Sequence, residues 1–128
     1  MNIAPSHLYQ NGDFVKAQHE TLEIHRNFNK SQTKIVTLSG QKIYGACFSN
    51  SSIDEIYVIS SYGYTIYFNI VNRTSGAKIL TKTFTIWGEY LDEVLCGNGK
   101  IFIATYTNLY AFSHNSSFIK LWKYSYGT

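Results

Sequence analysis

The stretch Gly97-Asn-Gly-Lys-Ile-Phe-Ile-Ala-Thr-Tyr-Thr-Asn-Leu-Tyr-Ala-Phe112 decides the fold of this chain. It begins with the pair Asn98-Gly99, which is typical of tight hairpin turns. Two short runs of β-branched and aromatic residues follow, separated by a polar turn, and a third run of the same character covers residues 119–124. Such runs favour strands over helices. The stretch therefore predicts antiparallel strands joined by short turns.

The same arrangement occurs three times along the 128 residues. Asn29, Asn72 and Asn115 are spaced 43 residues apart, each at a polar turn between two runs of strand character. A further apolar run precedes each hairpin, so each unit contains four short strands in up-and-down order. We place the three units of this single domain at about residues 2–41, 42–87 and 88–128. No segment has a sustained helical period with capping residues, so the sequence predicts an all-β fold.

Four antiparallel strands that recur every 43 residues are typical of the blades of a β-propeller. One blade cannot bury both faces of its sheet alone, so blades stack face to face around an axis. A β-sandwich of about ten strands is the alternative, but a sandwich gives no reason for the recurrence. We therefore expect three four-stranded, propeller-like blades.

Three blades are fewer than a closed propeller uses, which is about four to eight. An open arc would expose apolar blade faces, and soluble monomers rarely tolerate such faces. We expect two chains, related by a two-fold axis, to close a six-bladed ring as a homodimer. The alternatives are three blades that close on themselves and a fragment of a longer gene product.

Residues 97–124 resemble a repeat of the PQQ-type (quinoprotein-like) β-propeller family. In that family a glycine-centred turn precedes a Val-Tyr-Val-Gly-Thr strand, and Leu-Tyr-Ala-Leu-Asp and Trp-Lys-Tyr follow. Here Ile101–Thr105, Leu109–Phe112 and Trp122–Tyr124 are similar to these three motifs. The resemblance is recognisable in the second unit and faint in the first. It implies the propeller fold, because these motifs pack blades and carry no catalysis.

The enzymes of that family bind a quinone with an adjacent Cys-Cys disulfide and a calcium ion, and this chain departs from that pattern. Cys47 and Cys96 lie at comparable points of separate units. We interpret both as small buried residues of a reduced protein, although the sequence leaves a disulfide open. Trp122 is interpreted as a packing residue. We expect no cofactor.

No group of residues has the spacing that catalysis or metal binding requires. The acidic pairs Asp54-Glu55 and Asp92-Glu93 occupy adjacent positions, and adjacent strand residues point to opposite faces. The histidines lack compact metal-ligand spacing, and the chain has neither a phosphate-binding loop nor a nucleophile elbow. We therefore expect a protein that is not an enzyme and has no metal site.

Charge and hydropathy argue against two classes of partner. A net charge of +3 is too small to indicate nucleic-acid binding, and the longest apolar runs fall far short of the roughly 20 residues that span a membrane. The first residues have no signal region, so we expect a cytoplasmic location. Phe, Tyr, Ile, Asn and Lys, which have AT-rich codons, are abundant. This composition indicates either a viral or microbial gene, in the viral case acting in the host cytoplasm, or selection for strand formers.

Binding is the function that remains. Propellers present loop surfaces on which proteins dock, although this inference rests on analogy between folds. Tyr62, Tyr64 and Tyr106 are the predicted contact residues, because tyrosines at loop ends bury much area at low entropic cost. Tyr57 and Tyr67 are expected in the core. We thus expect an interaction scaffold that binds itself and an unidentified protein partner.

A carbohydrate-binding propeller is the alternative function. In it, Tyr and Trp rings would stack on sugars and the turn asparagines would bind hydroxyls. The residues before those asparagines do not keep an aromatic side chain; they are Phe28, Val71 and His114. The sequence therefore favours the interaction scaffold.

Overall fold

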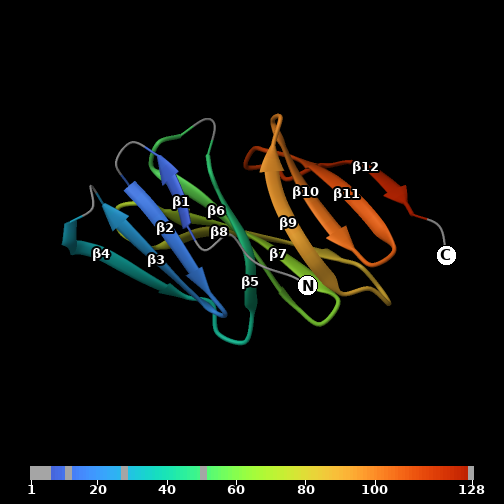
Figure 1. The fold of residues 1–128 in the computed structure, drawn as a ribbon, viewed down its shortest axis with the longest axis horizontal. Coiled ribbons are helices and arrows are strands. Elements are labelled where there is room, and N and C mark those ends of the chain that lie inside the picture. Colours follow the sequence, from blue (N-terminus) through green and yellow to red (C-terminus); the bar gives the residue numbers. More distant parts are fainter. Residues whose placement is uncertain (1–6, 11–12, 27–28, 50–51, 127–128) are drawn as a thin grey trace.

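The computed structural model describes residues 7–10, 13–26, 29–49 and 52–126. Within these residues the strands form three separate four-stranded antiparallel sheets, as the sequence predicts (Figure 1). In each sheet the strands follow one another in chain order, which is the up-and-down arrangement of a propeller blade. We call the sheets blade 1, blade 2 and blade 3.

Each blade lies within one of the three expected units. Blade 1 consists of β1 (His7–Gln10), β2 (Asp13–Gln18), β3 (Thr21–Arg26) and β4 (Asn29–Thr37). Blade 2 consists of β5 (Lys42–Phe48), β6 (Glu55–Tyr62), β7 (Thr65–Asn72) and β8 (Lys78–Thr85). Blade 3 consists of β9 (Leu91–Gly97), β10 (Lys100–Thr105), β11 (Asn108–Ser113) and β12 (Lys120–Ser125).

Turn chemistry sets the length of several strands. Asn98 and Gly99 have φ values of 52° and 71°, as the predicted hairpin turn between β9 and β10 requires. Asn72 Oδ1 accepts the backbone N–H groups of Thr74 and Ser75 at 2.9 and 2.8 Å, which closes the turn after β7. Asn29 differs from the prediction, because it is the first residue of β4 and the turn before it lies outside the described residues.

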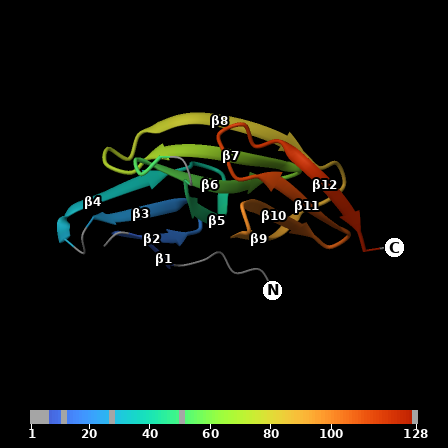
Figure 2. The same cartoon turned by 90° about the horizontal axis from the view of Figure 1, so that it is seen from above.

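Two apolar cores lie between the blades, at what we call seam 1–2 and seam 2–3. Successive side chains of β6 point to opposite faces of the sheet and so contribute to both cores. Ile56 and Val58 pack into seam 1–2, whereas Tyr57 and Ile59 pack into seam 2–3. All four side chains are fully buried, which confirms the core position predicted for Tyr57. Figure 2 shows the blades fanned side by side, with β1, β5 and β9 at the inner edge and β4, β8 and β12 outside.

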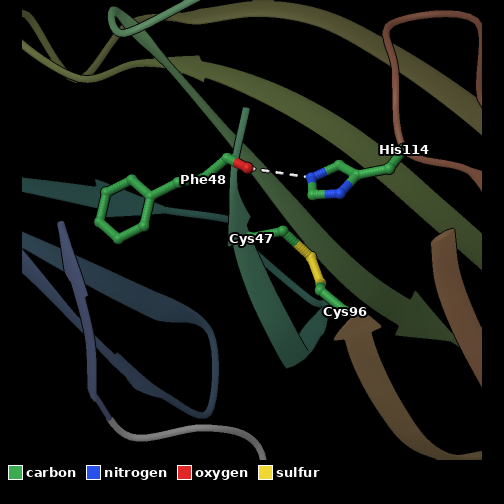
Figure 3. Close-up of a disulfide and its surroundings, with 4 residues drawn as sticks. All are labelled: Cys47, Phe48, Cys96 and His114. Atoms are coloured by element: carbon green, nitrogen blue, oxygen red, sulfur yellow. Dashed lines mark hydrogen bonds between the residues drawn. A yellow bond between two sulfur atoms is a disulfide. The ribbon is translucent and has the colours of Figure 1, made fainter. Parts of the chain in front are cut away.

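A disulfide between Cys47 and Cys96 links the inner strands of blades 2 and 3 (Figure 3). Their Cα atoms are 6.2 Å apart, within the range that disulfides span. Cys47 is buried as expected, but Cys96 is exposed and the two are bonded, so the interpretation of both as buried thiols was wrong for Cys96 and for the reduced state. The register of the inner strands β5 and β9 on their neighbours brings the two cysteines together. Cys47 pairs with Tyr57 and Cys96 with Ile101, and both partners point into seam 2–3.

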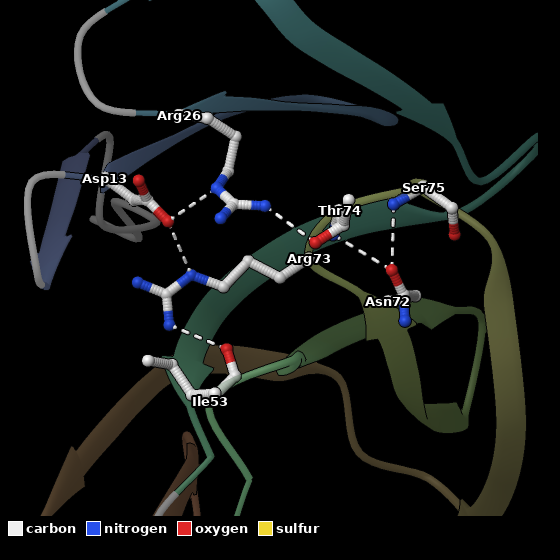
Figure 4. A network of polar contacts seen from close by, with 7 residues as sticks. All are labelled: Asp13, Arg26, Ile53, Asn72, Arg73, Thr74 and Ser75. Atoms are coloured by element: carbon white, nitrogen blue, oxygen red, sulfur yellow. Dashed lines mark hydrogen bonds and ion pairs between the residues drawn. The ribbon is translucent and has the colours of Figure 1, made fainter.

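A buried cluster of charges links blade 1 to blade 2 (Figure 4). Asp13 at the start of β2 accepts a hydrogen bond from Nε of Arg73 at 2.9 Å and pairs with Nε of Arg26 at the same distance. Arg73 is only 2% exposed, and its Nη1 also donates to the carbonyl of Ile53 at 3.0 Å. The two arginines share the single carboxylate of Asp13, and because Arg73 follows β7 while Asp13 and Arg26 belong to blade 1, the cluster ties the two blades together.

Candidate binding surfaces

Within the described residues, no cluster of His, Cys, Asp or Glu side chains is arranged to hold a metal ion. The described part of the chain likewise has no helix of the length and apolarity needed to cross a membrane. The remaining candidates are surfaces. Three of them stand out: a row of exposed aromatic rings at seam 2–3, a pocket at seam 1–2, and the outer face of blade 3.

The aromatic row consists of Tyr64, Trp87 and Tyr90. Tyr64 lies in the turn between β6 and β7, and the other two lie in the loop between β8 and β9. The ring of Tyr64 has its centroid 6.1 Å from that of Trp87 and 5.0 Å from that of Tyr90. A hydrogen bond with Tyr64 raises the pKa of the Tyr90 hydroxyl. Trp87 is 81% exposed, so the row presents a large apolar area to solvent.

Glu89 holds the loop that carries this row. Its Oε1 accepts hydrogen bonds from Thr105 and Asn108 at 2.6 and 2.7 Å, and its Oε2 accepts one from Tyr110 at 2.8 Å. Partial burial raises the pKa of Glu89, but these hydrogen bonds outweigh it and leave the pKa below its ordinary value. Burial and the bond to Glu89 raise the pKa of Tyr110. The ionised Glu89 therefore ties the β8–β9 loop to the β10–β11 hairpin.

Tyr106 lies beyond this network, in the turn between β10 and β11, and is 81% exposed. It interacts electrostatically with Tyr44 of β5. Burial raises the pKa of Tyr44, and the neighbouring Asp92 and Tyr106 raise it further. Tyr106 is thus available for contact at the same seam as the aromatic row, although no ring contact joins it to the row among the described residues.

Tyr62 occupies a different site, a pocket of about 310 Å³ at seam 1–2. We call it the Tyr62 pocket, and its lining residues are Ser39, Gly40, Gln41, Tyr62 and Tyr67. Tyr67 is half-buried in its wall, so it is not the core residue that the sequence predicts. A larger hollow of about 500 Å³ shares Ser39 and Gln41 with the pocket and runs along β4 toward Gly76 and Lys78.

The three predicted contact tyrosines therefore belong to two seams. Tyr64 joins the aromatic row, Tyr106 lies near it, and Tyr62 lines the pocket. Sequence reasoning missed Trp87 and Tyr90, although a signal was present. Both flank a Gly-Glu pair that interrupts the strand pattern between the second and third units, where a loop would carry them to the surface.

The outer face of blade 3 is a third candidate surface, which we call the blade 3 free face. Leu95, Phe102, Ala111 and Trp122 are paired in register across the four strands, so their side chains share this face. Leu95 is 59% and Trp122 41% exposed. Trp122 packs beside Phe102 of the same sheet, with ring centroids 6.1 Å apart, but no other blade of the described chain covers it.

A comparison of equivalent positions in blades 2 and 3 indicates the role of this face. Phe102 is the third residue of β10, as Tyr57 is the third residue of β6. Tyr57 is completely buried, because blade 3 covers it. Leu109, the second residue of β11, likewise corresponds to the buried Ile66 of β7. The blade 3 free face thus repeats the pattern of a covered blade face.

The opposite end of the stack, the blade 1 free face, has a more polar character. Phe14 stacks on His25 with ring centroids 4.3 Å apart, and His25 Nε2 lies 3.0 Å from Glu23 Oε1. Lys16 pairs with Glu23 in register and shares this face. Ile35 adds an apolar side chain that is mostly exposed. The two ends of the stack therefore differ, one apolar and the other mixed.

Comparisons with known proteins bear on the fold. No family model matches the chain, and no curated protein matches it significantly. Among solved structures it is similar to BamB from Moraxella catarrhalis, with a TM-score of 0.58 and 17% sequence identity over 89% of this chain. The blades are β-propeller blades. The similarity supports a propeller-repeat protein, and the chain spans 33% of the length of BamB.

Proposed function

We propose that this chain is a non-enzymatic binding scaffold made of PQQ-type propeller blades, and that a second copy of the chain continues its blade stack. The observation that carries the proposal is the blade 3 free face, where Phe102 and Leu109 occupy positions that are buried in blade 2. Fully burying one such apolar side chain contributes about 1.5 to 3 kcal/mol, and Phe102 and Leu109 are only half-buried in one chain, so leaving this face uncovered is unfavourable.

The blade that fits this face is blade 1 of the second copy. In a two-fold symmetric dimer, each blade 3 would cover the partner's blade 1, and two equal seams would form. Each face carries one acidic and one basic residue, Glu93 and Lys100 on the blade 3 free face and Glu23 and Lys16 on the blade 1 free face, so ion pairs across the seam are part of the proposal. These charges make the new seams more polar than seams 1–2 and 2–3. We therefore expect a reversible homodimer whose affinity decreases as salt increases.

A further protein partner is part of the same proposal, and the aromatic row is the surface where we expect it. Tyr and Trp rings at the ends of loops bury much area on binding at low entropic cost. The cytoplasmic location stays a prediction. The disulfide between Cys47 and Cys96 favours an oxidising compartment instead, because cytosolic thiols are kept reduced.

Complementation between two variants tests the arrangement of the dimer. Phe102→Asp places a charge on the blade 3 free face, and Phe14→Asp places one on the blade 1 free face. We expect each variant alone to elute as a monomer in size exclusion, and the mixture to regain a dimer through its one unaltered seam. Ile79→Asp, at an exposed position of β8, is the matched control and should behave as wild type.

Two outcomes would contradict this arrangement. If Phe14→Asp remains a dimer while Phe102→Asp dissociates, the second copy docks blade 3 against blade 3. If neither variant changes the mass of a dimeric wild type, the free faces are not the interface. Circular dichroism of each variant separates loss of association from loss of fold.

A further inference from the structure

We propose that the Tyr62 pocket binds one ring of a neutral carbohydrate, which can extend beyond the pocket, a ligand that goes beyond the scaffold function proposed above. The pocket measures about 310 Å³, and none of its lining residues carries a charge. Two tyrosines from the paired strands β6 and β7 form one side, and the β4–β5 loop, with Ser39 and Gln41, forms the other. This is a small, aromatic and hydrogen-bonding site.

Gln41 supplies the directional contact. Its side-chain oxygen accepts a hydrogen bond from the hydroxyl of Ser60 at 2.5 Å, and Ser60 in turn accepts one from Nδ2 of Asn69 at 3.1 Å. These bonds hold the amide group of Gln41 in one orientation. Its Nε2 donor has no protein acceptor within the described part of the chain. The pocket therefore contains a positioned amide donor that a ligand can use.

The chemistry of the lining matches a pyranose ring. Such a ring has a face of C–H groups that packs on an aromatic side chain, and an edge of hydroxyls that need donors and acceptors. Tyr62 and Tyr67 offer the rings, while Gln41 and Ser39 offer an amide and a hydroxyl. An uncharged lining favours neutral sugars over acidic ones, because it would not compensate a buried carboxylate.

The surroundings of the pocket leave room for more than one sugar. The hollow of about 500 Å³ along β4 shares Ser39 and Gln41 with the pocket, so a chain of sugar rings can continue toward Gly76. By contrast, two of the turn asparagines suggested by the sequence are engaged elsewhere. The Oδ1 atoms of Asn72 and Asn115 both accept backbone N–H groups of their own turns. These two side-chain oxygens are therefore engaged within their turns, and the side chain of Asn29 lies outside the described part of the chain.

A proline-rich peptide is the competing occupant, since paired tyrosines also bind proline rings. Peptides of this kind lie along extended aromatic grooves, whereas the aromatic lining here ends with Tyr62 and Tyr67, and the adjoining hollow along β4 has no aromatic side chain among its lining residues. We therefore favour the sugar, and the peptide becomes an outcome of the test.

The test begins with a glycan array of neutral and sialylated glycans probed with the wild-type chain. We expect neutral glycans to bind, and the methyl glycoside of the best terminal sugar to compete. Tyr62→Ala should weaken binding at least tenfold, because Tyr62 is 68% exposed and its loss removes a ring without disturbing the core. Tyr62→Phe keeps the ring and should bind nearly as wild type. Gln41→Glu keeps an acceptor for Ser60 but removes the amide donor, and should also weaken binding at least tenfold.

Tyr126→Ala is the matched control and should bind as wild type, because Tyr126 is another exposed tyrosine and lies just after β12, away from the pocket lining. The proposal is overturned if no neutral glycan binds, if only sialylated glycans bind, or if Tyr62→Ala and Gln41→Glu bind unchanged. Capture of a polyproline peptide in place of any glycan would also overturn it. Because the mass of each sample is measured separately, failure of the dimer and failure of sugar binding are distinguishable.

Discussion

The disulfide offers the sharpest prediction about stability. Cys47 and Cys96 are separated by 49 positions in the chain, so their bond closes a long loop. In the chain-entropy model, a closed loop of this length removes unfolded-state entropy worth about 4 kcal/mol at 25 °C. For a chain of this size, each kcal/mol shifts the unfolding midpoint by about 3 to 5 °C. Loss of the bond should therefore lower the midpoint by roughly 12 to 20 °C.

The assay is thermal unfolding followed by circular dichroism, with and without a phosphine reductant. The midpoint of wild type should fall by this amount when the reductant is added. The midpoint of the double variant Cys47→Ala/Cys96→Ala should be lower than that of oxidised wild type by the same amount under both conditions. The variant is also the control, since its midpoint must not respond to the reductant. If the midpoint of wild type is unchanged on reduction, or if two thiols titrate in the folded, non-reduced protein, the bond between blades 2 and 3 does not form.

Three further predictions concern the contacts between and within the blades. Asp13→Asn should destabilise the fold by about 3 to 5 kcal/mol in urea unfolding, because Arg73 then remains buried without a countercharge; a loss below 1 kcal/mol would mean that Arg73 is solvated. Glu89→Gln should cost about 1 kcal/mol near pH 7. Since the pKa of Glu89 is lowered in the folded state, the difference from wild type should shrink as the pH falls below 4.5 and not as it rises. Gly45→Ala should cost about 1 to 3 kcal/mol, because an added Cβ would lie 3.0 Å from the side chain of Val94 across seam 2–3; unchanged stability would show that the inner strands are not in close contact.

The blades are the part of the structure that the sequence predicts well, and the reason is local. In β6, alternate residues serve opposite seams, so Ile56 and Tyr57 follow a period of two that is visible without any tertiary information. The Asn98-Gly99 turn is equally local, because both residues must adopt positive φ. Repetition at 43 residues then extends the pattern from one blade to three.

The contacts between blades could not be predicted, because they depend on how two sheets are placed against each other. Whether Cys47 faces Cys96 depends on register: one residue of slip would point either sulfur out of seam 2–3. Asp13 and Arg73 are 60 residues apart and meet only when blade 1 packs on blade 2. No pattern in the sequence pairs them.

In the candidate binding sites, too, the individual residues are predictable from local sequence, whereas their grouping depends on tertiary packing. Tyr62 and Tyr64 were singled out because they flank a glycine in a turn, which is a local signal. They belong to different surfaces because their neighbours differ. Tyr62 lies beside Gln41 of the β4–β5 loop, whereas Tyr64 contacts Trp87 of the β8–β9 loop. Sequence identifies the aromatic residues at the ends of strands, and packing decides which of them act together.

Continuation of the blade stack by a second copy is the central claim, and the absolute mass of the wild-type chain tests it most directly. Light scattering after size exclusion, repeated over a range of protein concentrations and at low and high salt, measures that mass. The account predicts a value near twice 14.6 kDa at high concentration and low salt, falling toward 14.6 kDa on dilution or added salt. A mass of 14.6 kDa at every concentration would contradict it, since the blade 3 free face would then stay uncovered.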